Sequence, residues 1–175
     1  MIMKALVVYE SMFGNTRQIA EAIASGLAES AEVAAVEVSA ATAEAAEGAD
    51  LLVAGGPTHA FSMSRPSTRS DAVNRGAPEG RDGTGLREWL HALPARHGPM
   101  LATFDTRVAK MRHWPGSAAK AAAKVGRHDG YELAAPPTSF YVDDVDGPLL
   151  DGELDRAQAW GRQLAASCRG RTHAS

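Results

Sequence analysis

Residues 7–23 have the sequence VVYESMFGNTRQIAEAI, and this stretch decides the fold. A β-branched apolar run over residues 3–9 predicts a buried strand, and apolar residues at helical spacing after Asn15 predict a helix. Residues 11–16 between them hold a glycine and a hydroxyl at each end, which favours a nest of donors for an anion. A simple helix cap by Ser11 or Asn15 is the alternative.

The loop at 11–16 also limits which phosphate it would bind. It lacks the lysine and the spacing of a nucleoside-triphosphate loop. Backbone N–H groups and hydroxyls would be the main ligands, so the monophosphate of a bound cofactor fits better than a leaving group awaiting catalysis.

The same alternation of apolar runs and helical segments continues along the chain. Further strands are predicted at residues 33–38, 50–55, 99–104 and 139–142, and helices at 42–47, 86–93, 117–125 and 154–164. Continuous apolar strands separated by helices indicate a parallel sheet covered on both faces. We therefore predict one doubly wound α/β domain of five strands and about five helices over residues 1–168, with 169–175 as a disordered tail.

Length and composition agree with this class. The chain has 175 residues, of which 45% are hydrophobic and 22% charged, and this is enough for one well-packed domain. Its single cysteine, Cys168, excludes an internal disulfide and fits a reducing compartment. No apolar run approaches the roughly 20 residues of a membrane span. We expect a cytoplasmic protein with no signal peptide and no membrane association.

Charge is distributed unevenly along the chain. Residues 1–64 carry two basic and eight acidic groups (−6), residues 65–127 carry twelve and five (+7), and residues 128–175 carry four and eight (−4). The basic middle third favours an anionic cofactor or partner, unless its arginines are only solvated. It contains no consecutive basic block, so nucleic-acid binding is not expected. The histidines show no ligand spacing, so no metal is expected either.

Two further loops carry candidate binding residues. Residues 55–61, GGPTHAF, follow the third strand, where His59 or Phe61 would stack on a flat ligand. Residues 103–107, TFDTR, follow the fourth strand, where Asp105 would hydrogen-bond a heteroaromatic edge or else form a surface pair with Arg107. Residues 55–84 show no clear period and are predicted to be a long functional loop at the carboxyl edge of the sheet.

Taken together, these segments resemble the flavodoxin-like proteins. The resemblance rests on VVYESMFGNTRQIAEAI (7–23), GGPTHAF (55–61), SRPSTR (64–69), FDTR (104–107), GSAAK (116–120) and GPLLDGELDRAQAWG (147–161). It implies a sheet of strand order 2-1-3-4-5 with FMN at its carboxyl edge. The phosphate would be held by the loop of Ser11, Met12, Phe13, Gly14, Asn15 and Thr16. The ring would be flanked by Pro57, Thr58, His59, Ala60 and Phe61 and by Thr103, Phe104, Asp105, Thr106 and Arg107.

The chain departs from the family pattern at three points. Phe13 stands where the family usually has a hydroxyl, which predicts the loss of one phosphate hydrogen bond. The fourth-strand loop has no tyrosine to stack on the ring, and Trp114 is the only large substitute. Arg65, Arg69 and Arg107 make the surroundings of the ring basic, which predicts a flavin less reducing than that of a typical carrier.

The resemblance implies an electron-transfer protein that passes electrons between a reductase and an acceptor protein, as a monomer or weak dimer. The first alternative is an FMN-dependent NAD(P)H:quinone-type oxidoreductase. The second is a docking module of the same fold that binds no flavin. No residue is assigned a catalytic role.

Overall fold

A computed structural model describes residues 2–80, 83–94 and 98–172. Its five strands form one sheet of order β2-β1-β3-β4-β5, in which every neighbouring pair is parallel. The strands are β1 (Lys4–Tyr9), β2 (Glu32–Glu37), β3 (Leu51–Pro57), β4 (Met100–Val108) and β5 (Thr138–Val142). The doubly wound fold predicted from the sequence is confirmed, including the strand order that the resemblance implied.

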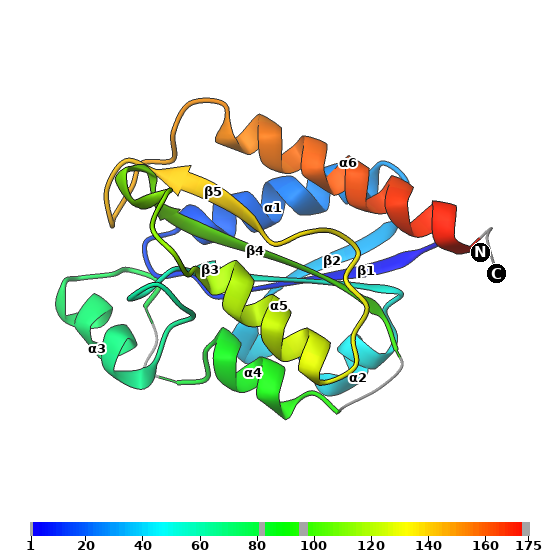
Figure 1. Cartoon of the computed structure of the whole chain (residues 1–175), viewed down its shortest axis with the longest axis horizontal. Coiled ribbons are helices and arrows are strands. Elements are labelled where there is room, and N and C mark those ends of the chain that lie inside the picture. The colour runs from blue at the N-terminus through cyan, green and yellow to red at the C-terminus, as the bar shows by residue number, and fades with distance from the viewer. Residues whose placement is uncertain (1, 81–82, 95–97, 173–175) are drawn as a thin grey trace.

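Helices cover both faces of this sheet (Figure 1). They are α1 (Asn15–Ala28), α2 (Ala43–Glu47), α3 (Pro66–Asn74), α4 (Leu86–Ala92), α5 (Ala118–His128) and α6 (Glu153–Thr172), with short 3-10 turns η1 (Val38–Ala40) and η2 (Ala109–Met111). In Figure 1, α1 and α6 lie on one side of the sheet, and α2, α4 and α5 lie on the other.

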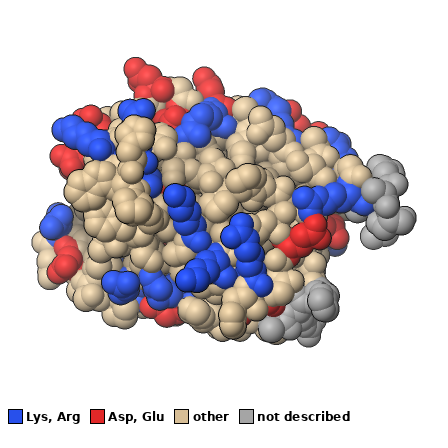
Figure 2. Space-filling model, in the orientation of Figure 1, with Lys and Arg blue, Asp and Glu red and all other residues tan. Residues whose placement is uncertain are grey.

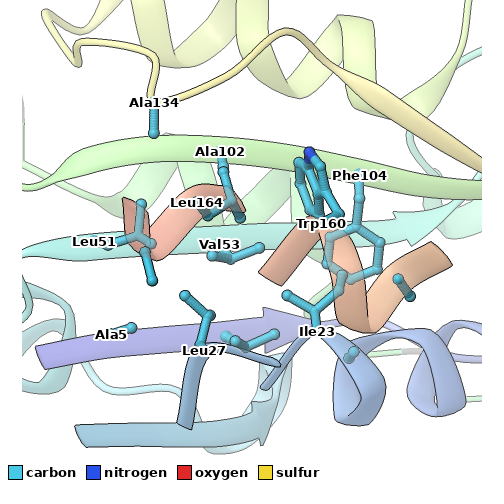
Figure 3. Close-up of a cluster of buried hydrophobic side chains, with 14 of the residues drawn as sticks. Ala5, Ile23, Leu27, Leu51, Val53, Ala102, Phe104, Ala134, Trp160 and Leu164 are labelled. Carbon is cyan, nitrogen blue, oxygen red and sulfur yellow. The ribbon is translucent and has the colours of Figure 1, made fainter. Parts of the chain in front are cut away.

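The core has one layer on each side of the sheet. The layer under α1 and α6 includes Val7, Ile23, Phe104 and Trp160, and several of its side chains appear in Figure 3. Helices α1 and α6 approach so closely that a Cβ on Gly26 would lie 2.0 Å from the Gln158 carbonyl oxygen. This backbone contact explains why a glycine sits on the apolar face of α1.

Three expectations from the sequence are corrected here. The segment 55–84 is not one irregular loop, because α3 begins within it at Pro66, a residue type favoured at the first helical position. Strand β4 extends to Val108 rather than 104, since it pairs with β5 from Phe104 to Val108. Helix α6 continues through Thr172, past the expected end of the domain at 168, and residues 173–175 lie outside the described residues.

Within the described residues, no helix combines the length and apolar character needed to cross a membrane. The same part of the chain contains no cluster of His, Cys, Asp and Glu side chains arranged to hold a metal ion.

Candidate functional site

The loop between β1 and α1 presents free backbone donors. Gly14 has φ +92°, a left-handed conformation that suits glycine and turns the chain into the helix. The Ser11 hydroxyl oxygen accepts the N–H groups of Gly14 (3.1 Å) and Arg17 (3.4 Å). Because the first-turn N–H groups of a helix have no intrahelical acceptor, those of Asn15 and Thr16 remain available, together with the hydrogen of the Ser11 hydroxyl.

Two contacts fix this loop against the rest of the sheet edge. The Thr16 and Thr106 hydroxyl oxygens lie 2.7 Å apart in a buried hydrogen bond, which joins the start of α1 to the end of β4. Gly147, at φ +103°, lies so close to Asn15 that an added Cβ would be 2.7 Å from the amide oxygen. The Asn15 side chain is therefore held in one position under the 143–149 loop.

The segment that follows α3 folds back onto the same loop. Glu79 donates its backbone N–H to the Met12 carbonyl (2.9 Å), and its carboxylate pairs with Arg17 Nε at 2.6 Å. Met12 is buried, whereas the partly exposed Phe13 faces the pocket described below. Sequence reasoning missed Glu79, since nothing in the 55–84 stretch marked its return to residue 12.

The exit of β3 is tied to both neighbouring elements. Thr58 donates its N–H to the Thr106 carbonyl (2.9 Å), and its hydroxyl accepts the Ala118 N–H at the start of α5 (2.9 Å). Thr58 thereby positions the β3 loop relative to both β4 and α5.

A strained turn follows at residues 59–62. His59 and Ser62 exchange both backbone hydrogen bonds, and the two residues between them, Ala60 and Phe61, have φ values of +46° and +63°. Consecutive left-handed residues without glycine are unfavourable, so the surrounding contacts must hold the turn in place. The turn presents Phe61 at the rim of the pocket.

His59 lines the pocket as an uncharged side chain. Its Nδ1 lies 3.0 Å from the Thr68 hydroxyl of α3. Burial, and then the positive charge of Arg69, lower the pKa of His59 below its ordinary value. The imidazole is therefore neutral at physiological pH and serves as a hydrogen-bonding, flat surface.

Trp114 lies outside the core, on the outer side of Phe61. The two rings stack with centroids 5.3 Å apart and an interplanar angle of 21°, and Trp114 is 53% exposed. A Cβ on Gly116 would lie 2.7 Å from the Phe61 carbonyl oxygen, so the backbone of the two loops is also in contact. Trp114 supports Phe61, and it does not line the pocket itself.

Three residues predicted to flank the ring lie elsewhere, because at this point of β4 both faces of the sheet are covered: Phe104 by the core on one side, and Thr103 and Asp105 by the start of α5 on the other. Phe104 is fully buried in the core. Thr103 donates its hydroxyl to the Ala119 carbonyl (2.8 Å), and Asp105 accepts the Ala119 N–H (2.9 Å). Burial raises the pKa of Asp105, against the lowering effect of that N–H. Thr103, Phe104 and Asp105 are therefore removed from the candidate site.

Thr106 and Arg107 remain at the site. Arg107 is only 6% exposed, its Nη2 donates to the Met111 carbonyl (2.5 Å) and the Trp114 carbonyl (3.3 Å), and its buried Nε has no hydrogen-bond partner within the described residues. It lines the pocket as a buried cation and also anchors the loop after β4.

Arg69, by contrast, belongs to a buried polar cluster behind the pocket. Its Nη2 pairs with Glu88 at 2.7 Å and its Nη1 donates to the Ser64 hydroxyl at 3.0 Å. That hydroxyl donates to Glu10, whose carboxylate also accepts the Leu86 N–H at 2.7 Å. The expectation that Arg69 faces the ligand is corrected, because its charge is matched inside this cluster.

Two adjoining pockets of about 310 and 70 Å³ open at this edge of the sheet. Residues common to both are Phe13, Thr58, His59, Arg107, Val108 and Val145. The smaller pocket reaches Asn15 and Thr16. The larger extends to Phe61 and Met111, to the α3 side chains Thr68, Asp71 and Ala72, and to Arg75, which follows α3. The end of the site that holds the free N–H groups of Asn15 and Thr16 is thus continuous with a wider, mostly apolar chamber.

The location matches the general rule for such sheets. The order of strands reverses between β1 and β3, and ligands of doubly wound proteins bind outside the carboxyl ends of the strands at this switch point. The fold and the two pockets together place a candidate ligand site at this switch point.

Comparison with known proteins makes this class more specific. Residues 6–67 match the model of the family described as flavodoxin domain. This match and the flavodoxin structures below support the resemblance to flavodoxin-like proteins that the sequence indicated. No curated protein matches it.

Solved structures show the same fold. A flavodoxin from the domain Archaea shares 22% identity at a TM-score of 0.66, covering 95% of this chain and 99% of that chain. Flavodoxin 2 from Bacillus cereus shares 19% identity at a TM-score of 0.67, and the match covers 93% of this chain and 98% of that chain. A flavone reductase shares 14% identity at 0.65, covering 99% of this chain and 65% of that one. At these identities the likeness is one of fold.

Proposed function

We propose that this chain binds FMN and passes electrons between a reductase and an acceptor protein. The observation that carries the proposal is the continuity between the free N–H groups of Asn15 and Thr16 and the chamber walled by Phe61 and Phe13. A phosphate and a flat ring on one molecule fit these two compartments.

The residues at the phosphate end suit a bound monophosphate. The N–H groups of Asn15 and Thr16 and the Ser11 hydroxyl converge there, and the helix dipole of α1 adds to their attraction. Phe13 contributes no hydroxyl to this end, but its ring joins the wall of the chamber. The nearby Glu79 carboxylate is neutralised by Arg17, so it does not repel the anion strongly.

The residues at the ring end exclude water and set the charge. FMN, when bound, supplies one- and two-electron chemistry that the side chains themselves lack. Phe61 offers an apolar face, His59 a neutral one, and Arg107 a buried positive charge that favours an anionic ligand. Asp105, the one buried acid of β4, faces α5, which favours a carrier over an enzyme with its own proton-transfer group.

A flavin titration tests this function. Flavin-free protein is titrated with FMN and, as a matched control, with riboflavin, while absorbance and flavin fluorescence are followed. We expect saturable FMN binding and much weaker riboflavin binding, because riboflavin lacks the phosphate. Ser11→Ala should weaken FMN and leave riboflavin unchanged. If the protein takes up no FMN, both redox functions fail and the flavin-free docking module is the better description.

A second candidate function is an FMN-dependent NAD(P)H:quinone-type oxidoreductase. It is favoured by the way α3 lengthens the chamber with Thr68 and Asp71, and the following residue, Arg75, extends it further, which leaves room beside a flavin for a small acceptor. Anaerobic addition of NADPH to the FMN-loaded protein separates the two. Bleaching of the flavin by NADPH alone supports the enzyme, and an unchanged spectrum supports the carrier.

A further inference from the structure

A positively charged surface adjoins the mouth of the chamber. Helix α5 carries Lys120, Lys124 and Arg127 on its exposed side, and η2 and the residue after it add Lys110 and Arg112; we call these five residues the basic face. Figure 2 shows Lys and Arg side chains gathered over the part of the surface that α5 covers in Figure 1.

The basic face is not explained by the stability of α5. The helix contains no acidic residue, and Lys120 lies in its first turn, where the helix dipole disfavours a cation. Lys124 follows Lys120 at i+4, a spacing at which like charges repel. Within the described residues, neither lysine forms an ion pair. Arg127 lies in the last turn, where a cation is favourable, but the two lysines oppose helix stability and are better explained by binding.

Exposed apolar side chains lie between the basic face and the chamber. Phe61, Met111 and Trp114 are 40–53% exposed, and the carbonyls of Met111 and Trp114 are held by Arg107 of the pocket wall. The start of α5 is bonded to Thr58 of the same wall. An aromatic centre bordered by charges is the usual make-up of a protein docking surface.

An acidic loop also borders the chamber. Asp143, Asp144 and Asp146 are exposed beside Val145, which lines the pocket. A charged partner is therefore attracted on one side of the mouth and repelled on the other, which fixes the orientation in which it docks.

We propose that the basic face, with Trp114 at its edge, docks the acidic surface of a partner redox protein over the chamber. The partner is defined by charge complementarity: a negative surface over α5 and η2, turned away from the acidic 143–146 loop. This inference rests on the proposed function only for the partner's redox role, since docking itself requires no flavin.

The test uses an acidic [2Fe–2S] ferredoxin as the probe and basic cytochrome c as the control protein. Binding to flavin-free and FMN-loaded protein is measured by calorimetry at low ionic strength. We expect the ferredoxin to bind and cytochrome c to bind far more weakly. Lys120→Glu should raise the ferredoxin Kd about fivefold, and the difference should vanish in about 1 M salt, where screening is nearly complete.

Two comparisons make this test decisive. Lys120→Glu places a favourable charge in the first turn of α5, so its Tm should rise while its affinity falls, and loss of folding cannot explain the weaker binding. Lys4→Glu makes the same charge change at the amino end of β1, on the opposite edge of the sheet, and should leave the Kd unchanged within about twofold.

Several results would overturn the proposal. The first is an equal change of the ferredoxin Kd in Lys4→Glu and Lys120→Glu, and the second is no binding of ferredoxin at all. The others are binding of cytochrome c or of duplex DNA that is stronger than binding of ferredoxin, and self-association of the protein through the basic face. Ferredoxin binding without FMN uptake would leave the docking surface intact and refute the proposed function. FMN uptake without ferredoxin binding would refute the docking surface and leave the proposed function intact.

Discussion

The hydroxyl oxygens of Thr16 and Thr106 lie 2.7 Å apart, although the two residues are 90 positions apart in the chain. Both are buried, and they join the loop that begins α1 to the last part of β4. The two walls of the smaller pocket are therefore held at a fixed separation by one hydrogen bond.

Removing both hydroxyls of this bond should cost less stability than the two single removals added together. Thr106→Val leaves the Thr16 hydroxyl buried without that partner, and we expect the free energy of unfolding to fall by about 1–3 kcal/mol. In the double variant Thr16→Val/Thr106→Val no hydroxyl is stranded, so the loss should be smaller than the sum of the two single losses. Urea unfolding of the four proteins measures this, and strictly additive losses would contradict the coupling.

Arg107 should raise the reduction potential of bound FMN. A cation about 5 Å from a reduced flavin, at an effective dielectric of ~20, contributes roughly 3 kcal/mol. Arg107→Gln should lower the one-electron potential by up to an amount on the order of 100 mV. Arg75→Gln is the matched control, since Arg75 also lines the chamber but is exposed and screened by solvent. Redox titration of the three proteins decides, and an Arg107→Gln potential equal to that of the unmodified protein would refute the role.

His59 should make the protein less stable in mild acid. Its pKa is lowered on folding, so below its ordinary value of 6.5 the unfolded chain binds a proton that the folded protein resists. Stability is therefore retained above about pH 6.5 and falls as the pH drops through the range between the two pKa values. His59→Gln should remove part of this fall. Urea unfolding at about pH 7.5 and 5.5 tests it, and identical pH dependence in both proteins would be inconsistent with a neutral His59.

Phe61 should contribute more to FMN affinity than Trp114. Phe61 lines the chamber, whereas Trp114 lies on its outer side. Phe61→Ala should weaken FMN about tenfold, because an aromatic contact contributes about 0.5–1.5 kcal/mol beyond the area it buries. Trp114→Ala should have a clearly smaller effect. Fluorescence titration with FMN measures both, and the reverse order would place the ring against Trp114 instead.

The turn at residues 59–62 should be stabilised by glycine. Ala60 has φ +46°, and left-handed backbone costs a residue with a Cβ about 1–2 kcal/mol. Ala60→Gly should raise the free energy of unfolding by up to about 1 kcal/mol, the strain relieved being partly offset by the entropy of glycine in the unfolded chain. The same change at Ala46, which lies inside α2 and is not left-handed, should be destabilising. A loss of stability in both variants would mean that the turn carries no strain.

The sequence by itself determined the fold and the position of the loop proposed to bind the phosphate. The apolar run at residues 3–9, the helical period after Asn15 and the glycine at 14 are local patterns. The parallel direction of the strands follows from their alternation with helices. Because the carboxyl ends of parallel strands share one edge, the β1 and β3 loops were bound to meet there. The placement of Thr58, His59 and Phe61 beside Asn15 and Thr16 follows from this geometry.

Only the tertiary structure decided which side chains of β4 face the chamber, and what its outer walls are. Pairing with β5 extends β4 past the predicted end of the strand, so Phe104 lies inside the core while Thr106 and Arg107, nearer the carboxyl edge, reach the pockets. The return of Glu79 to Arg17 and the stack of Trp114 on Phe61 join residues with no shared local pattern. Contacts of this kind depend on how whole elements pack against one another, and no spacing within one segment encodes them.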